Sequence, residues 1–551
     1  MQAEKAAMTV DISDSDDETP VDSRSFWKAG SSYALAPNSN FNLKAVSNDQ
    51  VEHARVHPKF LHSNATSHKW AFGAIAELLD NAVDEIHNGA TFLKVDKLDV
   101  MKDNSPALLF QDDGGGMDPQ SLRKCMSLGY SSKKAQTTIG QYGNGFKTST
   151  MRLGADAIVF SRARRENQAT QSVGLLSYTF LRKTGQEDVI VPMIDFDISG
   201  HWAVPIIYSS QNDWSSNLKT ILEWSPFASK EELLHQFETI GDHGTRIIIY
   251  NLWLNDEGIY ELNFDDDEED ICLRDEVTSG SATKLRGKDA ELHSHVSYRL
   301  RYSLRAYASI LYLRKFTNFN IILRGKPVEQ FNIADNLKHW EVVTYKPHSA
   351  TISKEDTTEI KIGFIKEAPA LASVTGFNVY HKNRLIRPFW KVTAEGSVRG
   401  NCTVGVLEAN FIQPAHDKQD FERSSLFIRF QNKLRQLILD YWNSHCKLLG
   451  YQTPGSKSQN MQKNQRPANM QMQLPANSMV DLSDRELESC EVAVEEICEE
   501  NIQLFRKCEE HKKKEAELKE MIVGLEKELE EEQRKCSQLA LILENTKKRL
   551  T

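Results

Sequence analysis

The sequence of 551 residues lacks any apolar run near the roughly 20 residues that a membrane-spanning helix requires. Its N-terminus, MQAEKAAMTVDISDSDDE, is too acidic and polar for a secretory signal peptide. Cysteine is also scarce, because only eight are scattered along the chain without a CxxC pair or a neighbouring HxxxH. This scarcity argues against a disulfide framework and against a zinc module. We therefore expect a soluble, intracellular protein with free thiols and no insertion into a membrane.

A strong charge of either sign is missing from most of the chain, because the net charge of −10 lies near the two ends. Residues 1–24 carry −5 and residues 483–551 carry −6, which leaves +1 for the body between them. Within that body, residues 265–276 alone contribute −7, so the rest of its surface is mildly basic. The composition is therefore compatible with nonspecific binding of nucleic acid.

Composition divides the chain into segments. Residues 1–50 are rich in Ser, Asp, Asn and Gly and poor in aliphatic residues, which predicts a disordered acidic N-terminal arm. Helical and strand-like patterns alternate over residues 51–262 and again over residues 291–447, as in layered α/β domains. The acidic residues 263–290 between them predict a loop or insertion. Residues 448–482, dominated by Gln, Asn, Ser and Pro, predict a linker.

Individual elements follow from local patterns within the two α/β regions. Runs of β-branched and aromatic residues predict strands at residues 158–165 and 245–254. In the second region SYRLRYSLRAYASILYL, at residues 297–313, predicts one helix, while FNIILRG, EIKIGFIK and FNVYHKNRLI predict strands. Both regions are therefore expected to mix helices with strands.

The C-terminal residues 483–551 predict a coiled coil, because apolar residues recur at spacings of three and four from Val494 to Leu543. Asn501, His511 and two glutamates would weaken this seam while fixing its register, so a partner helix is expected.

Two short segments, around Val10 and Val480, combine an aliphatic core with an acidic flank. Such segments can add a strand to a small modifier such as SUMO, and phosphorylation of their serines would increase the charge. The alternative is an ordinary acidic linker, since matches this short arise often by chance.

Chemistry-bearing residues gather in three short motifs, of which the first is ELLDNAVDE. Glu77, Asn81 and Asp84 lie at i, i+4 and i+7, on one stripe of a helix that is predicted to end at Gly89. A carboxylate there can deprotonate water, and an amide oxygen one turn away can coordinate Mg²⁺. Taken alone, the same spacing also fits a solvated acidic stripe.

The second motif, DDGGGM, follows ALLF, a predicted buried strand that delivers Asp112 to its end. A carboxylate there can accept a hydrogen bond from an exocyclic amine, which distinguishes adenine from guanine. Gly114 and Gly116 allow the backbone to approach a base closely. The alternatives are a plain turn or a calcium loop, and the alternating oxygen ligands of a calcium loop are missing.

The third motif, GQYGNGFKTST, runs from a glycine loop into a helix that is predicted to start at Lys147 or Thr148. Backbone NH groups of Gly143 and Gly145, together with the positive end of that helix, can bind phosphates. Phe146 separates Gly145 from Lys147, so the motif is not a Walker loop. Protein kinase signatures are absent, and the spacing does not fit a Rossmann fingerprint.

In this order the three motifs resemble the GHKL ATPase family, which includes heat-shock chaperones, gyrase, mismatch-repair MutL and histidine kinases. The resemblance implies an α/β fold, with a Bergerat-fold ATPase domain (an α/β sandwich) over residues 51–262 that binds ATP and Mg²⁺. It implies Glu77 as general base, Asn81 as magnesium ligand and Asp112 as adenine reader, with a mobile lid at residues 131–133. The nucleotide contacts that it implies are Asp112, Gly114, Gly116, Met117, Ser131, Ser132, Lys133, Gly140, Gly143, Asn144, Gly145, Phe146, Lys147 and Thr245.

The second α/β region narrows the resemblance. YHKNRLIRPFWKV at residues 380–392 and AHDKQDFE at residues 415–422 are similar to the microrchidia (MORC) branch. That branch implies a transducer domain of ribosomal S5-like fold over residues 291–447, from which Lys418 returns to the terminal phosphate of ATP. The alternative is that Lys418 is a surface cation. Because the sequence shows no CW-type zinc finger, it resembles the compact plant type of MORC protein.

The MORC resemblance implies a nuclear, Mg-dependent ATPase whose heads close together on ATP binding while the coiled coil holds a homodimer or a heterodimer of paralogous chains. It also implies chromatin compaction and transcriptional gene silencing with silencing factors, linked in plants to RNA-directed DNA methylation and immunity. Nonspecific DNA contacts are expected through phosphates at positions such as Arg162, Arg164 and Arg165, although a solvated edge strand explains these arginines equally well.

Three rival functions stay open. One is a chaperone-like clamp of the same superfamily, which would need a client-binding domain. Another is a DNA-processing ATPase with a nuclease or repair role, and whether nuclease activity is intrinsic is left open. The third is a coiled-coil scaffold with a degenerate nucleotide site, against which intact Glu77, Asn81 and Asp112 count.

Overall fold

The computed structural model describes residues 54–130, 138–140, 143–165, 168–200, 202–255, 257–274, 292–347, 357–394 and 396–451. The predictions for the acidic arm, most of the linker, the coiled coil and the two segments around Val10 and Val480 lie outside these residues. So do the lid positions Ser131, Ser132 and Lys133. No helix within the described ranges has the length and apolar character needed to cross a membrane.

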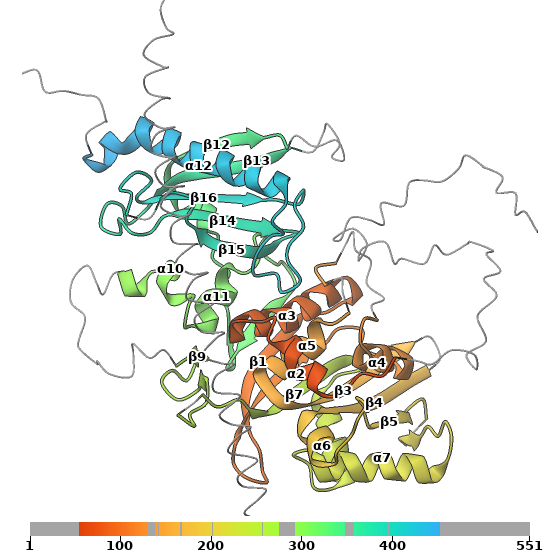
Figure 1. Ribbon diagram of the computed structural model, residues 1–551. Coiled ribbons are helices and arrows are strands. Elements are labelled where there is room, and N and C mark those ends of the chain that lie inside the picture. Colours follow the sequence, from red (N-terminus) through yellow and green to blue (C-terminus); the bar gives the residue numbers. More distant parts are fainter. Residues whose placement is uncertain are drawn as a thin grey trace, which may run out of the picture. The chain divides into compact units, whose positions relative to one another are not determined.

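Helices and strands both occur in the first and in the second half of the described chain (Figure 1). The α-helices are α2 (Lys59–Ala65), α3 (Ala71–Asp84), α4 (Pro119–Met126), α5 (Gly145–Leu153), α6 (Tyr178–Lys183), α7 (Gln211–Trp224), α8 (Lys230–His235), α10 (Val296–Arg299), α11 (Leu304–Ile310) and α12 (Ser425–His445). Short 3₁₀ helices are η2 (Glu85–Asn88), η3 (Gln236–Thr239), η4 (Ile333–Asn336) and η5 (Cys446–Leu449).

The first sheet is nine-stranded and mixed. Strands β1 and β10 pair in parallel, and all other neighbouring strands of the sheet pair antiparallel. Its order is β11 (Lys326–Pro327), β10 (Asn320–Leu323), β1 (Phe92–Asp99), β2 (Pro106–Asp112), β7 (Gly244–Leu252), β3 (Gly154–Arg165), β4 (Gln168–Ser177), β5 (Met193–Asp197) and β6 (Val204–Pro205). Strands β10 and β11 come from beyond residue 291, so a segment assigned to the second domain by sequence completes this sheet.

Helices cover both faces of this sheet because side chains alternate along its central strands. Leu108 and Phe110 of β2 join the apolar cluster that contains α3 and α5, whereas Leu109 joins the cluster that contains α7, α8 and η3. On β3, Val159 and Phe160 divide between the same two clusters. The first domain is therefore a layered α/β sandwich, as predicted.

The second sheet has five strands and carries the long helix α12. Its order is β12 (Leu337–Tyr345), β13 (Thr358–Ile365), β16 (Thr403–Glu408), β14 (Gly376–His381) and β15 (Arg384–Trp390). Phe427, Phe430, Leu434 and Ile438 recur at helical spacing and are buried on one face of α12, which packs on β13 and β16. The remaining strands, β8 (Leu262–Asn263) and β9 (Cys272–Leu273), pair with each other. The five-stranded sheet and α12 form the second α/β unit that the sequence predicted.

Most local predictions are confirmed, but two helix predictions are wrong. The strand predicted over FNVYHKNRLI is instead a hairpin of β14 and β15, because the chain turns at Lys382 and Asn383 with φ of 45° and 72°. Strands β2, β3 and β7 lie where the sequence placed them, and Gly89 ends the first helical segment with a left-handed φ of 94°. Helix α5 begins at Gly145, not at Lys147 or Thr148, because it packs along α3 despite the low helix propensity of glycine. The predicted helix at residues 297–313 is two helices, because the Ser303 hydroxyl caps a new helix by accepting from the Ala306 amide.

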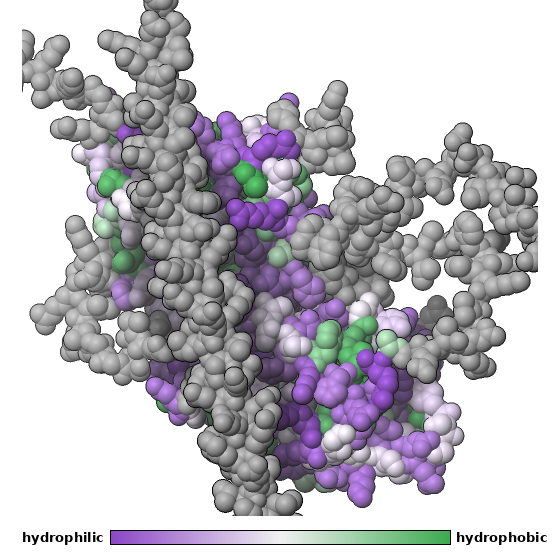
Figure 2. All heavy atoms as spheres, viewed as in Figure 1, coloured by the Kyte–Doolittle hydropathy of each residue, from purple (hydrophilic) through white to green (hydrophobic). Residues whose placement is uncertain are grey.

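The visible face of the described residues is mostly hydrophilic, with small and separate apolar patches (Figure 2). The most exposed large apolar side chains include Trp202 and Tyr208, at 83% and 63%. Exposed apolar side chains are ordinary on a folded protein, although Trp202, Val204, Ile207 and Tyr208 lie within seven residues of one another.

Candidate functional site

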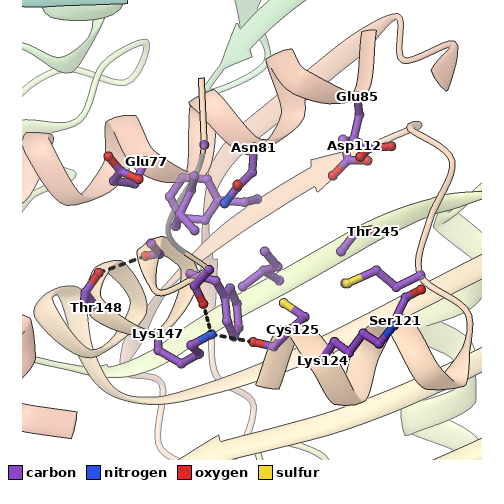
Figure 3. A pocket seen from close by; sticks show the side chains of 18 of the residues that line it. Glu77, Asn81, Glu85, Asp112, Ser121, Lys124, Cys125, Lys147, Thr148 and Thr245 are labelled. Atoms are coloured by element: carbon purple, nitrogen blue, oxygen red, sulfur yellow. Dashed lines mark hydrogen bonds between the residues drawn. The ribbon is translucent and has the colours of Figure 1, made fainter. Parts of the chain in front are cut away.

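A cavity of about 260 Å³ lies where α3, α4 and α5 meet the first sheet (Figure 3), and His416 and Lys418 from the second domain also line it. In that view Glu77 and Asn81 extend from one helix, while Ser121 and Lys124 come from another across the cavity. The predicted site residues that line it are Glu77, Asn81, Asp112, Gly116, Met117, Gly140, Gly143, Gly145, Phe146, Lys147, Thr245 and Lys418. The three motifs and the distant lysine therefore share one cavity.

Helix α3 presents its acids to the interior of the protein. Glu77 and Asp84 are only 6% and 8% exposed as whole residues, so the solvated-stripe alternative is wrong. Asp84 anchors the glycine loop, because its two carboxylate oxygens accept from the backbone amides of Ile139 at 2.8 Å and Gly140 at 3.0 Å. Glu77 and Asn81 therefore face the cavity, while Asp84 fixes the loop that borders it.

Asp112 lies at the end of β2, where its backbone pairs with Thr245 of β7. Its Oδ1 accepts from the Gly114 amide at 2.9 Å, so the turn holds the carboxyl in place. Burial raises the pKa of Asp112 to about 7, and the nearby acids Glu85 and Asp113 add to this rise. Gly114 therefore holds the Asp112 carboxyl in place and does not itself line the cavity.

Gly116 is required by the backbone of the same turn. Its φ is 64°, and a Cβ at this position would lie 1.9 Å from the carbonyl oxygen of Arg162. Any other residue would force β3 away from the motif. Gly116, which was predicted to let the backbone approach a base, thus lets this turn approach the backbone of β3.

The third motif brings its glycines beside Glu77. A Cβ at Gly145 would lie 2.6 Å from Glu77 Oε2, so this position must stay small for the acid to keep its place. Asn144 precedes α5, and its Oδ1 accepts from the Gly129 amide at 2.8 Å. The first turn of α5 therefore lies next to the carboxylate and the amides of the loop.

Lys147 has a role that the sequence did not indicate. Its ammonium donates to the carbonyls of Cys125 at 3.0 Å, Ser127 at 2.7 Å and Gly143, and its side chain is 2% exposed. Burial lowers the pKa of Lys147. Its charge therefore ties the end of α4 to the glycine loop, although other atoms of the residue line the cavity.

Lys418 arrives from the second domain, 341 residues after Glu77. Its Nζ donates to Glu77 Oε1 at 2.7 Å and to Asp80 Oδ2 at 3.2 Å, and the side chain is 5% exposed. Burial opposes its charge, but the two carboxylates prevail and the pKa of Lys418 is raised. The surface-cation alternative is therefore wrong.

Sequence reasoning missed several residues of this site. Asp80 belongs to the first motif, but its importance depends on Arg384 and Lys418, which no local spacing connects to it. His68 is buried, with Nε2 at 3.2 Å from the Thr148 hydroxyl, and burial lowers the pKa of His68. The other cavity residues that were not predicted are Leu78, Glu85, Leu93, Phe110, Ser121, Lys124, Cys125, Tyr130, Thr148, Ile247 and His416.

The polar groups that line the cavity fit a nucleotide with bound magnesium. The Asn81 amide and the Glu77 carboxylate supply oxygen near the loop, whose amides precede α5 and suit phosphates. Asp112 lies at the end of β2, farther along the cavity from Glu77, where its carboxyl can accept a hydrogen bond from the amine of a base. Lys418 supplies a cation at the end marked by Glu77.

Comparison with known proteins supports the same interpretation of both domains. Residues 68–198 match the family of histidine kinase-, DNA gyrase B- and HSP90-like ATPases, and residues 302–442 match the Morc6 ribosomal protein S5 domain 2-like family. The chain is 58% identical to Protein MICRORCHIDIA 2 of Arabidopsis thaliana, over 96% of this chain and 92% of that protein. It is 56% identical to Protein MICRORCHIDIA 1 of the same plant, over 96% and 91%. Identity to MORC family CW-type zinc finger protein 3 of Mus musculus is 37%, over 70% and 39%.

Proposed function

Since this chain belongs to the microrchidia (MORC) family of GHKL ATPases, we propose that it binds ATP with Mg²⁺ and hydrolyses it in the cavity beside Glu77. One observation carries the proposal. Glu77, Asn81 and Asp112 from the first domain share a single cavity with Lys418 from the second. A structural cluster would need neither a base-reading carboxyl nor a glycine loop beside a helix start.

Each residue has a distinct task in the proposed reaction. Asp112 accepts from the adenine amine, and the amides before α5 hold the phosphates. Asn81 holds the magnesium ion, which when bound offsets the charge of the phosphates. Glu77 takes a proton from the attacking water, and Lys418 stabilises the negative charge that develops on the terminal phosphate.

Beyond hydrolysis, we propose that ATP draws two heads together while residues 483–551 hold the subunits, as identical or paralogous chains. In the same proposal the protein acts in the nucleus in chromatin compaction and gene silencing with silencing factors, in plants through RNA-directed DNA methylation and immunity. Family membership supports the chromatin-related part of this proposal.

Nonspecific DNA binding is proposed through two arginines of β3. The Arg164 and Arg165 side chains are 65% and 55% exposed, which suits contact with phosphates. Arg162 is excluded from this group, because its side chain is partly buried and its guanidinium donates to the carbonyls of Ile240 at 2.9 Å and Gly241 at 2.7 Å.

The test of the enzymatic proposal uses the purified full chain. Binding of ATP and release of phosphate are measured with and without Mg²⁺, and we expect turnover that depends on the magnesium ion. A chain that binds the nucleotide without turnover would support the degenerate scaffold. One that does not bind the nucleotide would overturn the proposal.

A further inference from the structure

Asp80 lies at the centre of a buried ion cluster that joins helix α3 to the second domain. Its Oδ1 accepts from Arg384 Nε at 2.9 Å and from the Tyr312 hydroxyl at 2.9 Å, while its Oδ2 accepts from Lys418 Nζ at 3.2 Å. The Asp80 and Arg384 side chains are each 1% exposed. Asp80 belongs to α3 and Arg384 begins β15, so the pair fixes one domain to the other.

The cluster balances two acids with two bases, but the two acids are held differently. Asp80 has three donors, so it keeps Arg384 and Tyr312 if the Lys418 ammonium moves. Among the described residues, the hydrogen bond that holds the Glu77 carboxylate comes from Lys418, at 2.7 Å. A buried charge without a partner is costly, so Lys418 must keep an anion beside it wherever its ammonium lies.

We propose that Asp80, fixed by Arg384, is the positioning residue that keeps Lys418 at the phosphate end of the cavity while its ammonium exchanges Glu77 for the terminal phosphate of ATP. This inference rests on the proposed ATPase function. In the cluster, Lys418 donates a hydrogen bond to Glu77, the carboxylate that must later take a proton from water. When a phosphate replaces that carboxylate as the partner of Lys418, Glu77 loses its hydrogen bond from the lysine, and its oxygen becomes available to take a proton from water. Glu77 is thus released only when a terminal phosphate is present.

A double-mutant cycle on the full chain tests this role. D80N, K418M and D80N/K418M are compared for binding of a nonhydrolysable ATP analogue, for binding of ADP, and for kcat and KM. We expect D80N to lose about tenfold in affinity for the analogue and in kcat, and to keep its affinity for ADP. D80N/K418M should be no weaker than K418M, because Asp80 acts through the lysine. Losses that add in the double variant, or equal losses for ADP and the analogue, would overturn the proposal.

Two further variants separate positioning from folding. Asp195 is a buried acid paired with Arg123 at 2.6 Å outside this cluster, so D195N should lower stability and leave the ratio of analogue to ADP affinity unchanged. If D80N does not fold because Arg384 is left without its partner, D80N/R384Q removes both charges and should show the same loss of that ratio. Wild-type protein that binds neither nucleotide refutes the ATPase function itself. Hydrolysis that is sensitive to K418M and insensitive to D80N refutes only the role of Asp80.

Discussion

At the scale of single residues, the proposed chemistry depends on the Glu77 carboxylate, which lies between Lys418 and the glycine loop. E77Q keeps the side-chain volume and an oxygen that can accept from Lys418, but it cannot take a proton from water. We expect kcat to fall about 10²- to 10⁴-fold with little change in ATP affinity, measured by phosphate release and direct binding. E261Q is the matched control, since Glu261 pairs with Arg152 at 2.7 Å outside the cavity lining. Wild-type turnover in E77Q would assign the base to another residue.

Asp112 offers a test in both affinity and stability. In D112N the side-chain amide offers one acceptor oxygen, whereas the Gly114 N–H and the adenine amine each need an acceptor. One of these two donors is therefore left facing the Asn NH₂ group. We expect ATP affinity to fall about 10- to 100-fold.

Without nucleotide, the stability of D112N should change in the opposite direction. The folded pKa of Asp112 is raised from 3.8 to about 7, so the fold disfavours the ionised form. The penalty is absent below pH 3.8, grows as the pH rises toward 7, and is complete above it. Since Asn does not ionise, the melting temperature of the D112N protein should exceed that of wild type by a few degrees at pH 8, and by less at pH 5. A gap that is constant across this range would contradict the raised pKa.

The roles that the sequence assigned to Glu77, Asn81 and Asp112 depended on spacing within one helix and on the end of one strand. Such local patterns survive folding, because helix and strand periodicity fixes which side chains share a face. Asp80 and Lys147 were not predictable in this way. Their partners are Arg384 and the carbonyls of α4, which only the tertiary structure brings near.

At the scale of elements, the contact between α3 and α5 governs the catalytic end of the cavity. In G145A the new Cβ would lie 2.6 Å from Glu77 Oε2, and Lys418 restrains the acid from moving aside. We expect kcat to fall about 10- to 100-fold, because a displaced base no longer meets the water. Thermal stability should hold or rise, since Ala in a helix is favoured over Gly by up to about 1 kcal/mol.

The control for this contact is G241A. A Cβ at Gly241 would meet no atom of the described residues within 4 Å, so a methyl group there should leave kcat and stability unchanged. Equal kcat in G145A and G241A would mean that α5 does not position Glu77.

The elements themselves were predictable where one pattern dominated. Strands β2, β3 and β7 are buried in the centre of the sheet, so their apolar runs identify them from sequence. The start of α5 and the break between α10 and α11 were missed, because packing on α3 overrides glycine propensity and a single serine cap divides an apolar run.

At the scale of the whole molecule, the site needs both domains. Lys418 reaches Glu77 across 341 positions, and β10 and β11 from beyond the predicted domain boundary complete the first sheet. No periodicity predicts such contacts, since they depend on how two separately patterned regions dock. Only the family resemblance pointed to Lys418 before the structure placed it.

The same dependence on two domains makes association of the subunits testable. Truncation after residue 482 removes the predicted coiled coil and keeps both domains with Lys418. We expect the full chain to have a dimer mass with or without nucleotide in light scattering, because a coiled coil associates without ATP. The truncated chain should have a monomer mass alone and a dimer mass with the nonhydrolysable analogue, because the phosphate contacts of Lys418 favour the closed heads.

K418M in the truncated chain supplies the matched control for this last experiment. It keeps the cavity and the length of the side chain but cannot bind the terminal phosphate by charge, so the analogue should no longer produce a dimer. A truncated chain that stays monomeric with bound analogue would show that ATP does not close the heads. A K418M chain that still dimerises would show that closure does not pass through the second domain.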